Sequence, residues 1–276
     1  MKKTIRLALA LLLVVASLLS LAACGEKAPA DASAAPNASV APDAPSAAPA
    51  VPAKEYVIYS DNAFAPFEFL DTATNTYIGV DMDLLAAIAV DQGFTYTIHN
   101  EGFDAAMGAV QSGQADGMIA GMTIKDSRKE TFDFSDGYFA DGQILVVPSG
   151  SAIASLDDLS GKVVAVKTST AGADYALEIS GQYGFTLQYY EDSPTMYTAV
   201  INGTNEACFE DFSVVGWAIV EDGLALQTVG DVINPGYYGF AVKKGTNPEL
   251  ITLFNAGLAN IKSSGQYDTI LAKYGY

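Results

Sequence analysis

From Tyr56 onward the chain alternates short β-rich runs with stretches of helical periodicity, and this rhythm restricts the fold more than any other feature. The run Tyr56–Ser60 is rich in β-formers, and residues 81–92 then place their apolar side chains on one helical face. Gly93 stops that helix. Strands that alternate with helices are typical of parallel sheets covered by helices. We therefore predict an α/β fold.

The alternation runs once to about residue 138 and then restarts, which predicts two α/β units. In the first unit we expect strands at 56–60, 94–98 and 117–120, and helices at 81–92 and 103–112. In the second we expect strands at 144–147, 162–166 and 207–209, and helices ending at 179, spanning 193–203 and spanning 212–220. A strand at 238–242 precedes closing helices at 248–263 and 266–274. Asp81 and Ser193 are the expected N-terminal caps of their helices.

The N-terminal segment is typical of a secretory signal. A basic start (residues 1–6) is followed by 17 uncharged residues, fewer than the ~20 that a spanning helix needs. Small residues precede Cys24, in a pattern that resembles a bacterial lipobox. We expect a signal peptide at 1–23 and lipidation at Cys24, which would anchor the protein at the extracytoplasmic face of the cytoplasmic membrane. An ordinary signal peptide with a chance cysteine and a retained membrane helix are the alternatives.

The next segment, residues 25–54, has a composition that cannot form a core. Twelve of its 30 residues are alanine and six are proline, and none is aromatic. Such a segment buries too little apolar surface to fold, so we predict a tether between the lipidated cysteine and the body. The folded part is then about 55–276.

Charge and composition exclude several function classes. The chain has 32 acidic and 14 basic residues, a balance that repels nucleic acid and anionic membrane. One histidine, His99, and two cysteines leave too few ligands for a transition-metal cage, and we expect neither a metal nor a cofactor. The nucleophile-elbow, Walker and dinucleotide motifs are absent from the sequence. We therefore expect that the protein is not an enzyme.

Four ordered motifs carry a family resemblance. They are S-D-N-A-F-A-P-F-E-F at 60–69, G-V-D-M-D-L at 79–84, A-G-M-T-I-K-D-S-R-K at 120–129 with D-F-S at 133–135, and V-A-V-K-T-S-T-A-G at 164–172 with D-Y-A at 174–176. Together they resemble the polar amino-acid solute-binding proteins of ABC importers, and the last motif is similar to the glutamine-binding branch. The resemblance covers about 56–276.

The resemblance implies a two-lobed, type II periplasmic-binding-protein-like fold. This fold has two mixed or parallel sheets flanked by helices and joined by a two-strand hinge, with the ligand between the lobes. Carried over, lobe 1 is 55–138 plus 240–276, and lobe 2 is 143–234. The hinges fall at about 139–142 and 235–239.

A free amino acid carries two opposite charges on one carbon, and burying them requires a partner for each. The resemblance implies that Arg128 holds the carboxylate with its planar guanidinium, and that Asp211 takes the ammonium. Thr170 and the N–H of Ala171 at a helix start would give a second grip on the carboxylate. Phe64 and Phe103 would hold the aliphatic part of the ligand between their rings. Ala120, Gly121 and Thr123 of the central motif complete this part of the site. Gly121 and Thr123 would add hydrogen-bond donors.

Asp61, Lys167 and Glu210 would meet the ligand's side chain. Lys167 can donate to an amide oxygen and Asp61 can accept from an amide nitrogen, which suits glutamine better than a basic side chain. The glutamine-binding branch has a histidine where this chain has Glu210, and a surface glutamate is the alternative interpretation at that position.

The expected function is a binding cycle in which a polar amino acid closes the lobes and is delivered to an ABC permease, with the protein acting as a monomer. A cyclohexadienyl or arogenate dehydratase-like enzyme on the same fold is one alternative. An amino-acid sensor module is the other.

Overall fold

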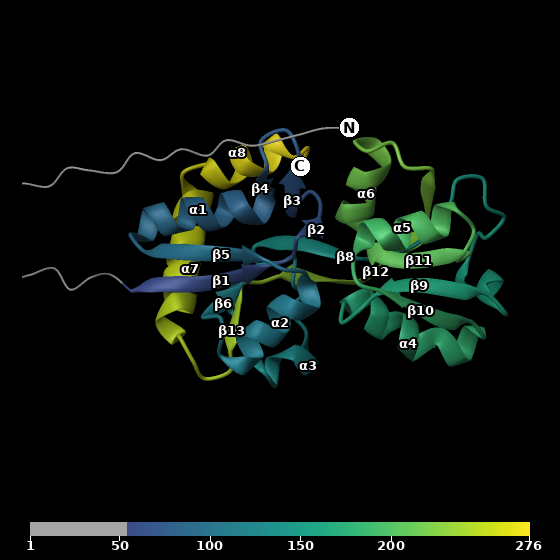
Figure 1. Cartoon of the computed structure of the whole chain (residues 1–276), viewed down its shortest axis with the longest axis horizontal. Helices are drawn as coiled ribbons and strands as arrows, with labels where there is room; N and C mark the ends of the chain where they lie inside the picture. Colours follow the sequence, from purple (N-terminus) through teal and green to yellow (C-terminus); the bar gives the residue numbers. More distant parts are fainter. Residues whose placement is uncertain (1–53) are drawn as a thin grey trace, which may run out of the picture. The chain divides into compact units, whose positions relative to one another are not determined.

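The structure is a computed structural model, and it describes residues 54–276 (Figure 1). The signal peptide, Cys24 and almost all of the predicted tether lie outside the described residues. The described part contains two five-stranded mixed sheets and one three-stranded sheet. None of the helices in 54–276 has the length and hydropathy that a membrane crossing requires.

The first sheet has the strand order β5-β1-β6-β13-β7. Its strands are β1 (Glu55–Ser60), β5 (Thr95–Asn100), β6 (Gly117–Met118), β7 (Phe132–Phe134) and β13 (Ala241–Lys243). The helices of this part are α1 (Val80–Gln92), α2 (Phe103–Ser112), α3 (Asp126–Lys129), α7 (Pro248–Ser263) and α8 (Gln266–Lys273). Side chains alternate across β1: Ile58 packs in the core shared with α1 and α7, and Tyr59 packs in the core shared with α2.

The second sheet has the strand order β10-β9-β11-β8-β12. Its strands are β8 (Phe139–Pro148), β9 (Val163–Lys167), β10 (Thr186–Tyr190), β11 (Ala207–Asp211) and β12 (Leu226–Tyr238). Its helices are α4 (Ala171–Tyr183), α5 (Ser193–Ile201), α6 (Phe212–Val220) and the 3₁₀ turn η1 (Leu156–Leu159). One core lies between this sheet and α4, and a second lies between the sheet and α5 and α6.

Two long strands connect the sheets. The chain enters the second sheet through β8 and leaves it through β12, and these strands pair antiparallel from Pro148↔Leu226 to Phe139↔Tyr238 (Figure 1). The pairing shifts register between Val229 and Gly236, next to the predicted hinge segments. The third, small sheet is formed by β2 (Ala63–Phe64), β3 (Glu68–Asp71) and β4 (Thr76–Ile78).

The predicted α/β class with two mixed sheets is confirmed, but several element predictions are wrong. The strand expected at 144–147 begins at Phe139, and the strand expected at 238–242 is divided between the end of β12 and β13. The small sheet, β7, β10 and most of β12 were not predicted. β12 contains turn-forming glycines and a proline, so its extended backbone depends on pairing with β8 rather than on local preference.

Both predicted caps are also wrong. Gly79 occupies the N-cap of α1, and Asp81 lies inside the first turn without a capping bond. Asp192 caps α5, because its carboxylate accepts from the N–H of Thr195 at 2.7 Å. Ser193 is buried as the first helical residue.

Candidate functional site

A small cavity lies between residues of the two sheets. Eleven of the twelve predicted ligand-binding residues line it: Phe64, Phe103, Ala120, Gly121, Thr123, Arg128, Lys167, Thr170, Ala171, Glu210 and Asp211. The twelfth, Asp61, is ion-paired with the lining residue Lys167. The structure therefore brings the whole predicted set together.

The topology explains this convergence. Asp61 follows the carboxyl end of β1, and Ala120 follows the carboxyl end of β6. Lys167 ends β9, and Glu210 and Asp211 end β11. Ligand sites in α/β sheets form beyond the carboxyl ends of the strands, where parallel strands release their loops together.

Arg128 is held rigidly in the wall of the cavity. Its Nη1 donates to the carbonyl of Thr123 and its Nη2 donates to the carbonyl of Ser169, each at 2.9 Å. The guanidinium carbon lies 5.4 Å from the ring centroid of Phe103. Burial lowers the pKa of Arg128 to about 10, against an opposing effect of Asp211, so the side chain remains a cation at neutral pH. This arrangement presents a fixed positive charge to the cavity.

Asp211 supplies the opposing charge. Its Oδ1 accepts from Nε2 of Gln143 at 3.0 Å, and its Oδ2 accepts from the hydroxyl of Tyr238 at 2.6 Å. Although Asp211 stands at the N-cap of α6, its side chain makes no capping bond. Burial raises the pKa of Asp211, and the bonds from Tyr238 and Gln143 lower it. Because those two donors hold the carboxylate in place, it can accept from a cation in the cavity.

The start of α4 forms a second part of the wall. Thr170 caps this helix: its Oγ1 accepts from the N–H of Ala173 at 3.2 Å and donates to the carbonyl of Lys167 at 2.7 Å. The first N–H groups of a helix have no acceptor within the helix, so the N–H of Ala171 is the more available donor of the predicted pair. The hydroxyl of Thr170 is already engaged.

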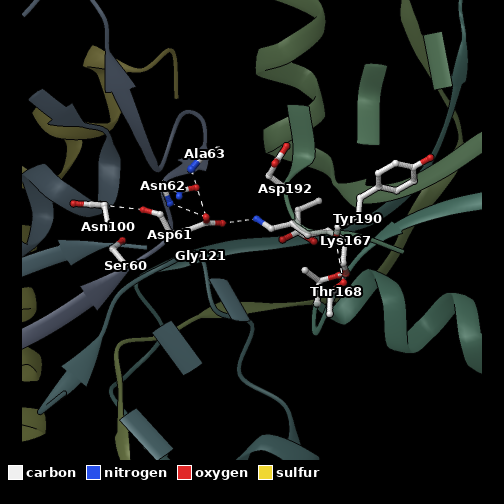
Figure 2. A network of polar contacts seen from close by, with 12 residues as sticks. Ser60, Asp61, Asn62, Ala63, Asn100, Gly121, Lys167, Thr168, Tyr190 and Asp192 are labelled. Atoms are coloured by element: carbon white, nitrogen blue, oxygen red, sulfur yellow. Dashed lines mark hydrogen bonds and ion pairs between the residues drawn. The ribbon is translucent and has the colours of Figure 1, made fainter. Parts of the chain in front are cut away.

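Lys167 and Asp61 form a buried ion pair that joins the two sheets (Figure 2). Their side chains are 2% and 1% exposed. Oδ1 of Asp61 accepts from the N–H of Asn62 at 2.6 Å, and Nζ of Lys167 lies 4.5 Å from the ring centroid of Phe64. Burial lowers the pKa of Lys167, but Asp61 and Glu210 outweigh this effect and raise it overall. Lys167 is therefore a cation in the wall of the cavity.

Glu210 is not a surface residue, because only 5% of it is exposed. Its Oε2 accepts from the hydroxyl of Tyr197 at 3.1 Å, and its Oε1 accepts from the N–H of Asp211 at 3.0 Å. Burial and the charge of Asp211 raise the pKa of Glu210 to about 7, although Lys167 acts in the opposite direction. The charge of Glu210 therefore changes near neutral pH.

Gly121 lines the cavity but does not offer the donor that was predicted. Its N–H donates to Oδ2 of Asp81 at 2.8 Å. Its φ is +52°, and a Cβ at this position would stand 2.4 Å from the ring of Phe64. A glycine is therefore required both by the left-handed backbone and by the close approach of the aromatic ring. The N–H belongs to the supporting structure rather than to the cavity.

Sequence reasoning missed the residues that position the predicted ones. Gln143 and Tyr238 orient Asp211, and Ser169 contributes the carbonyl that receives Arg128. Ser169 has a φ of +63°, and its hydroxyl donates to Oδ1 of Asp104 at 2.5 Å. Only its place between Thr168 and Thr170, inside a family motif, could have drawn attention to it. In residues 54–276 no group of three or more histidine, cysteine, aspartate or glutamate side chains is arranged to hold a metal.

Comparisons with known proteins find binding proteins that are similar to this chain over most of its length. A "Probable histidine-binding protein" of Neisseria gonorrhoeae is 33% identical over 234 residues, which cover 83% of this chain and 86% of that protein. The second substrate-binding domain of Lactococcus lactis GlnP, solved in an open conformation, is 44% identical with a TM-score of 0.57, and the match covers 81% of this chain and 97% of that one. The arginine-, lysine-, histidine-binding protein ArtJ of Geobacillus stearothermophilus is 32% identical with a TM-score of 0.74, and the match covers 80% of this chain and 95% of that one.

The family comparison covers nearly all of the described residues. A model of the bacterial extracellular solute-binding proteins, family 3, matches residues 56–276. The match includes every residue that lines the cavity. This chain belongs to the bacterial extracellular solute-binding proteins, family 3.

Proposed function

We propose that the protein captures a polar amino acid, with glutamine as the best candidate, and delivers it to an ABC importer permease. The observation that carries the proposal is the placement of a buried guanidinium, Arg128, and a buried carboxylate, Asp211, around one small cavity. An α-amino acid has the complementary pair of charges on one carbon. Two of the relatives described above, a probable histidine-binding protein and an arginine-, lysine-, histidine-binding protein, support an amino acid as the class of ligand.

In this proposal the ligand carboxylate binds Arg128 and the N–H of Ala171, and the ammonium binds Asp211. The two backbone carbonyls occupy two of the five N–H donors of the guanidinium, and hydrogen bonds from the other donors to an anion are charge-assisted and therefore stronger. The rings of Phe64 and Phe103 cover the aliphatic part of the ligand. Each buried charge then has a partner, which offsets its desolvation.

The Lys167–Asp61 pair supports a ligand whose side chain is uncharged and carries both a hydrogen-bond donor and an acceptor. The pair presents a donor and an acceptor with no net charge, which matches the oxygen and the nitrogen of a carboxamide. A guanidinium or ammonium at this place would approach Lys167, and like charges in a dry site repel strongly. Glutamine avoids this repulsion, and arginine and lysine do not.

The lobes in this proposal are 55–138 plus 240–276 and 143–234, with hinges at 139–142 and 235–239. Contacts across the cavity support a closed form: Lys167 with Asp61, Ser169 with Arg128 and Asp104, and Lys125 with Asp174. The open GlnP domain has a lower TM-score against this structure than ArtJ has, although its sequence identity to this chain is higher. Rotation of one lobe against the other lowers such a score without altering either lobe, which supports a hinge between the lobes.

We further propose that the chain is a lipoprotein. Removal of 1–23 and lipidation of Cys24 would leave residues 25–54 as a tether that holds a monomeric binding protein near its permease. Incorporation of radiolabelled palmitate into the wild-type chain, and its loss in Cys24→Ala, is the expected outcome. Equal labelling of both proteins would exclude lipidation at this position.

A screen of the twenty amino acids tests the ligand assignment. The chain from residue 25 is heated in the presence of each amino acid, and glutamine should give the largest rise in Tm. A hundredfold excess over Kd stabilises a binding protein by about 2.7 kcal/mol. A larger rise with arginine or histidine would overturn glutamine but keep amino-acid binding. Formation of an aromatic product from prephenate or arogenate would replace the binding function by the dehydratase alternative.

Arg128→Met tests the site itself. The variant leaves a ligand carboxylate without its buried cation, and this should weaken binding by about 2–5 kcal/mol. Calorimetry measures the affinity, and Lys129→Met, next to it but exposed, is the matched control. Near wild-type affinity in Arg128→Met would exclude the role of Arg128 as the carboxylate partner.

A further inference from the structure

Two carboxyl groups lie completely buried behind the wall of the cavity. Glu68 on β3 and Asp81 on α1 are both 0% exposed, and neither lines the cavity. Oδ2 of Asp81 accepts from the N–H of Gly121 at 2.8 Å and from the hydroxyl of Tyr138 at 2.7 Å. Its Oδ1 and both oxygens of Glu68 have no donor when the two groups are ionised. Three buried carboxylate oxygens therefore lack the hydrogen bonds that such atoms require.

The surroundings do not supply a cation to balance two anions. The charged groups that face Glu68 are Asp81, Asp61 and Lys167, and the cation of this set is already ion-paired with Asp61. The phenol of Tyr138 faces the pair and serves as a donor to Asp81. Two adjacent carboxylates without a cation cannot both stay ionised in a dry interior.

A single proton shared by Glu68 and Asp81 would remove one of the two negative charges and supply a donor to an oxygen that lacks one. The side chains of Glu68 and Asp81 are within hydrogen-bonding reach of each other, and a bond between two carboxyl groups exists only when one of them is protonated. Asp81 already receives two donors, which favours its ionised form, whereas Glu68 receives none. Burial raises the pKa of Glu68 well above its usual range, and it also raises the pKa of Asp81, to about 7.

We propose that Glu68 and Asp81 hold one proton between them, carried by Glu68, and that this acid pair fixes Gly121 of the cavity wall and Tyr138 at the entry to β8. The protonated Glu68 donates to the free oxygen of Asp81. The other oxygen of Asp81 then holds the N–H of Gly121 and the hydroxyl of Tyr138 together. The pair is thus a positioning device that links the ligand cavity to the strand that crosses between the sheets.

The link to ligand binding rests on the proposed function, but the shared proton does not, and it can be tested without ligand. The folded chain keeps a proton that the unfolded chain loses above the ordinary glutamate pKa of about 4.3. The stability of the folded state must therefore fall as the pH rises from there to the pKa of Glu68 in the folded state. In Glu68→Gln the amide donates to Asp81 at every pH, so this loss is absent.

Unfolding in urea from pH 5 to pH 9 measures the effect, with Glu210→Gln as the background in both proteins so that Glu210 does not contribute. The unfolding constant of the Glu210→Gln protein, relative to that of the double variant that also carries Glu68→Gln, should rise by up to about tenfold per pH unit. The control is Asp83→Asn, on the same helix as Asp81 but half-exposed and paired with Lys273. A ratio that does not change with pH would overturn the proposal.

Infrared spectroscopy gives a second test that needs no change at residue 68. The Glu210→Gln protein is prepared with ¹³C in the glutamate carboxyl groups and measured at pH 7.5, where free glutamate is ionised. A protonated carboxyl stretching band that shifts with the label is expected. The absence of such a band, or a band that does not shift because an aspartate carries the proton, would overturn the assignment to Glu68.

Discussion

At the scale of single residues, burial determines the charge that each side chain presents. Arg128 and Lys167 are both buried, and both remain cations for different reasons. Arginine has so high an intrinsic pKa that desolvation leaves it charged, whereas Lys167 depends on Asp61 and Glu210. Glu210 has Lys167 as an opposing influence, but burial and Asp211 prevail. The cavity therefore combines two permanent cations with the carboxyl of Glu210, which titrates near neutrality.

Glu210 makes the stability of the protein depend on pH. Its pKa is about 7 in the folded protein and about 4.3 in an unfolded chain, so the folded state binds the extra proton between these values. The contribution of Glu210 to the free energy of unfolding should fall as the pH rises from about 4.5 to about 7, by up to about 4 kcal/mol, and the total fall should be smaller in Glu210→Gln by this amount. Urea unfolding of both proteins at pH 5 and pH 8 measures it.

The exposed Glu221 provides the control, since Glu221→Gln removes a glutamate without a buried environment. A difference between the wild type and Glu210→Gln that is the same at both pH values would contradict the burial argument.

At the scale of elements, the loop between β9 and α4 does more than connect a strand to a helix. Lys167 ends the strand, Thr170 caps the helix, and Ser169 lies between them with a positive φ. This conformation turns the carbonyl of Ser169 to Arg128 and its hydroxyl to Asp104, at the start of α2. A short loop of the second sheet thus contacts two elements of the first.

The Ser169–Asp104 hydrogen bond should slow ligand release. Each of Ser169→Ala and Asp104→Ala should raise the dissociation rate by about 2–10-fold, because a hydrogen bond contributes about 0.5–1.5 kcal/mol. Stopped-flow measurement of ligand dissociation gives the rates. The double variant should release ligand no faster than the more affected single variant, because both substitutions remove the same bond. Strictly multiplicative effects would show that the two residues act separately.

At the scale of the whole described chain, elements that pack around the two five-stranded sheets meet through aromatic side chains as well as through the cavity. Trp217 on α6, which packs on the second sheet, has ring-centroid distances of 6.2 Å to Phe69 on β3 and 6.3 Å to Tyr274 after α8. It is the one tryptophan in the sequence. Rotation of one lobe against the other must change these contacts.

The fluorescence of Trp217 should therefore report lobe closure. Addition of ligand should give a saturable change whose midpoint agrees with the Kd from calorimetry. Arg128→Met should show no change at the concentration that saturates the wild type, which separates closure from a direct effect of the ligand. Heat of binding without any fluorescence change would argue against movement between the lobes.

The sequence pattern was sufficient to predict elements whose structure depends on residues close together in the chain. Helices α2, α6 and α7 begin and end where their periodicity and flanking residues predict. The ordered motifs were enough to identify the family and to select residues that the structure gathers around one cavity.

Sequence alone thus determined the α/β class, the family and the candidate residues, because periodicity, stop signals and motifs are local properties of a chain. Tertiary structure decided that β12 is extended, that Asp81 supports Gly121 instead of capping α1, and that Glu210 is buried. These outcomes depend on strand pairing and desolvation between residues far apart in the chain. No short stretch of sequence contains that information, because the free energy of each group depends on which distant neighbours exclude water from it.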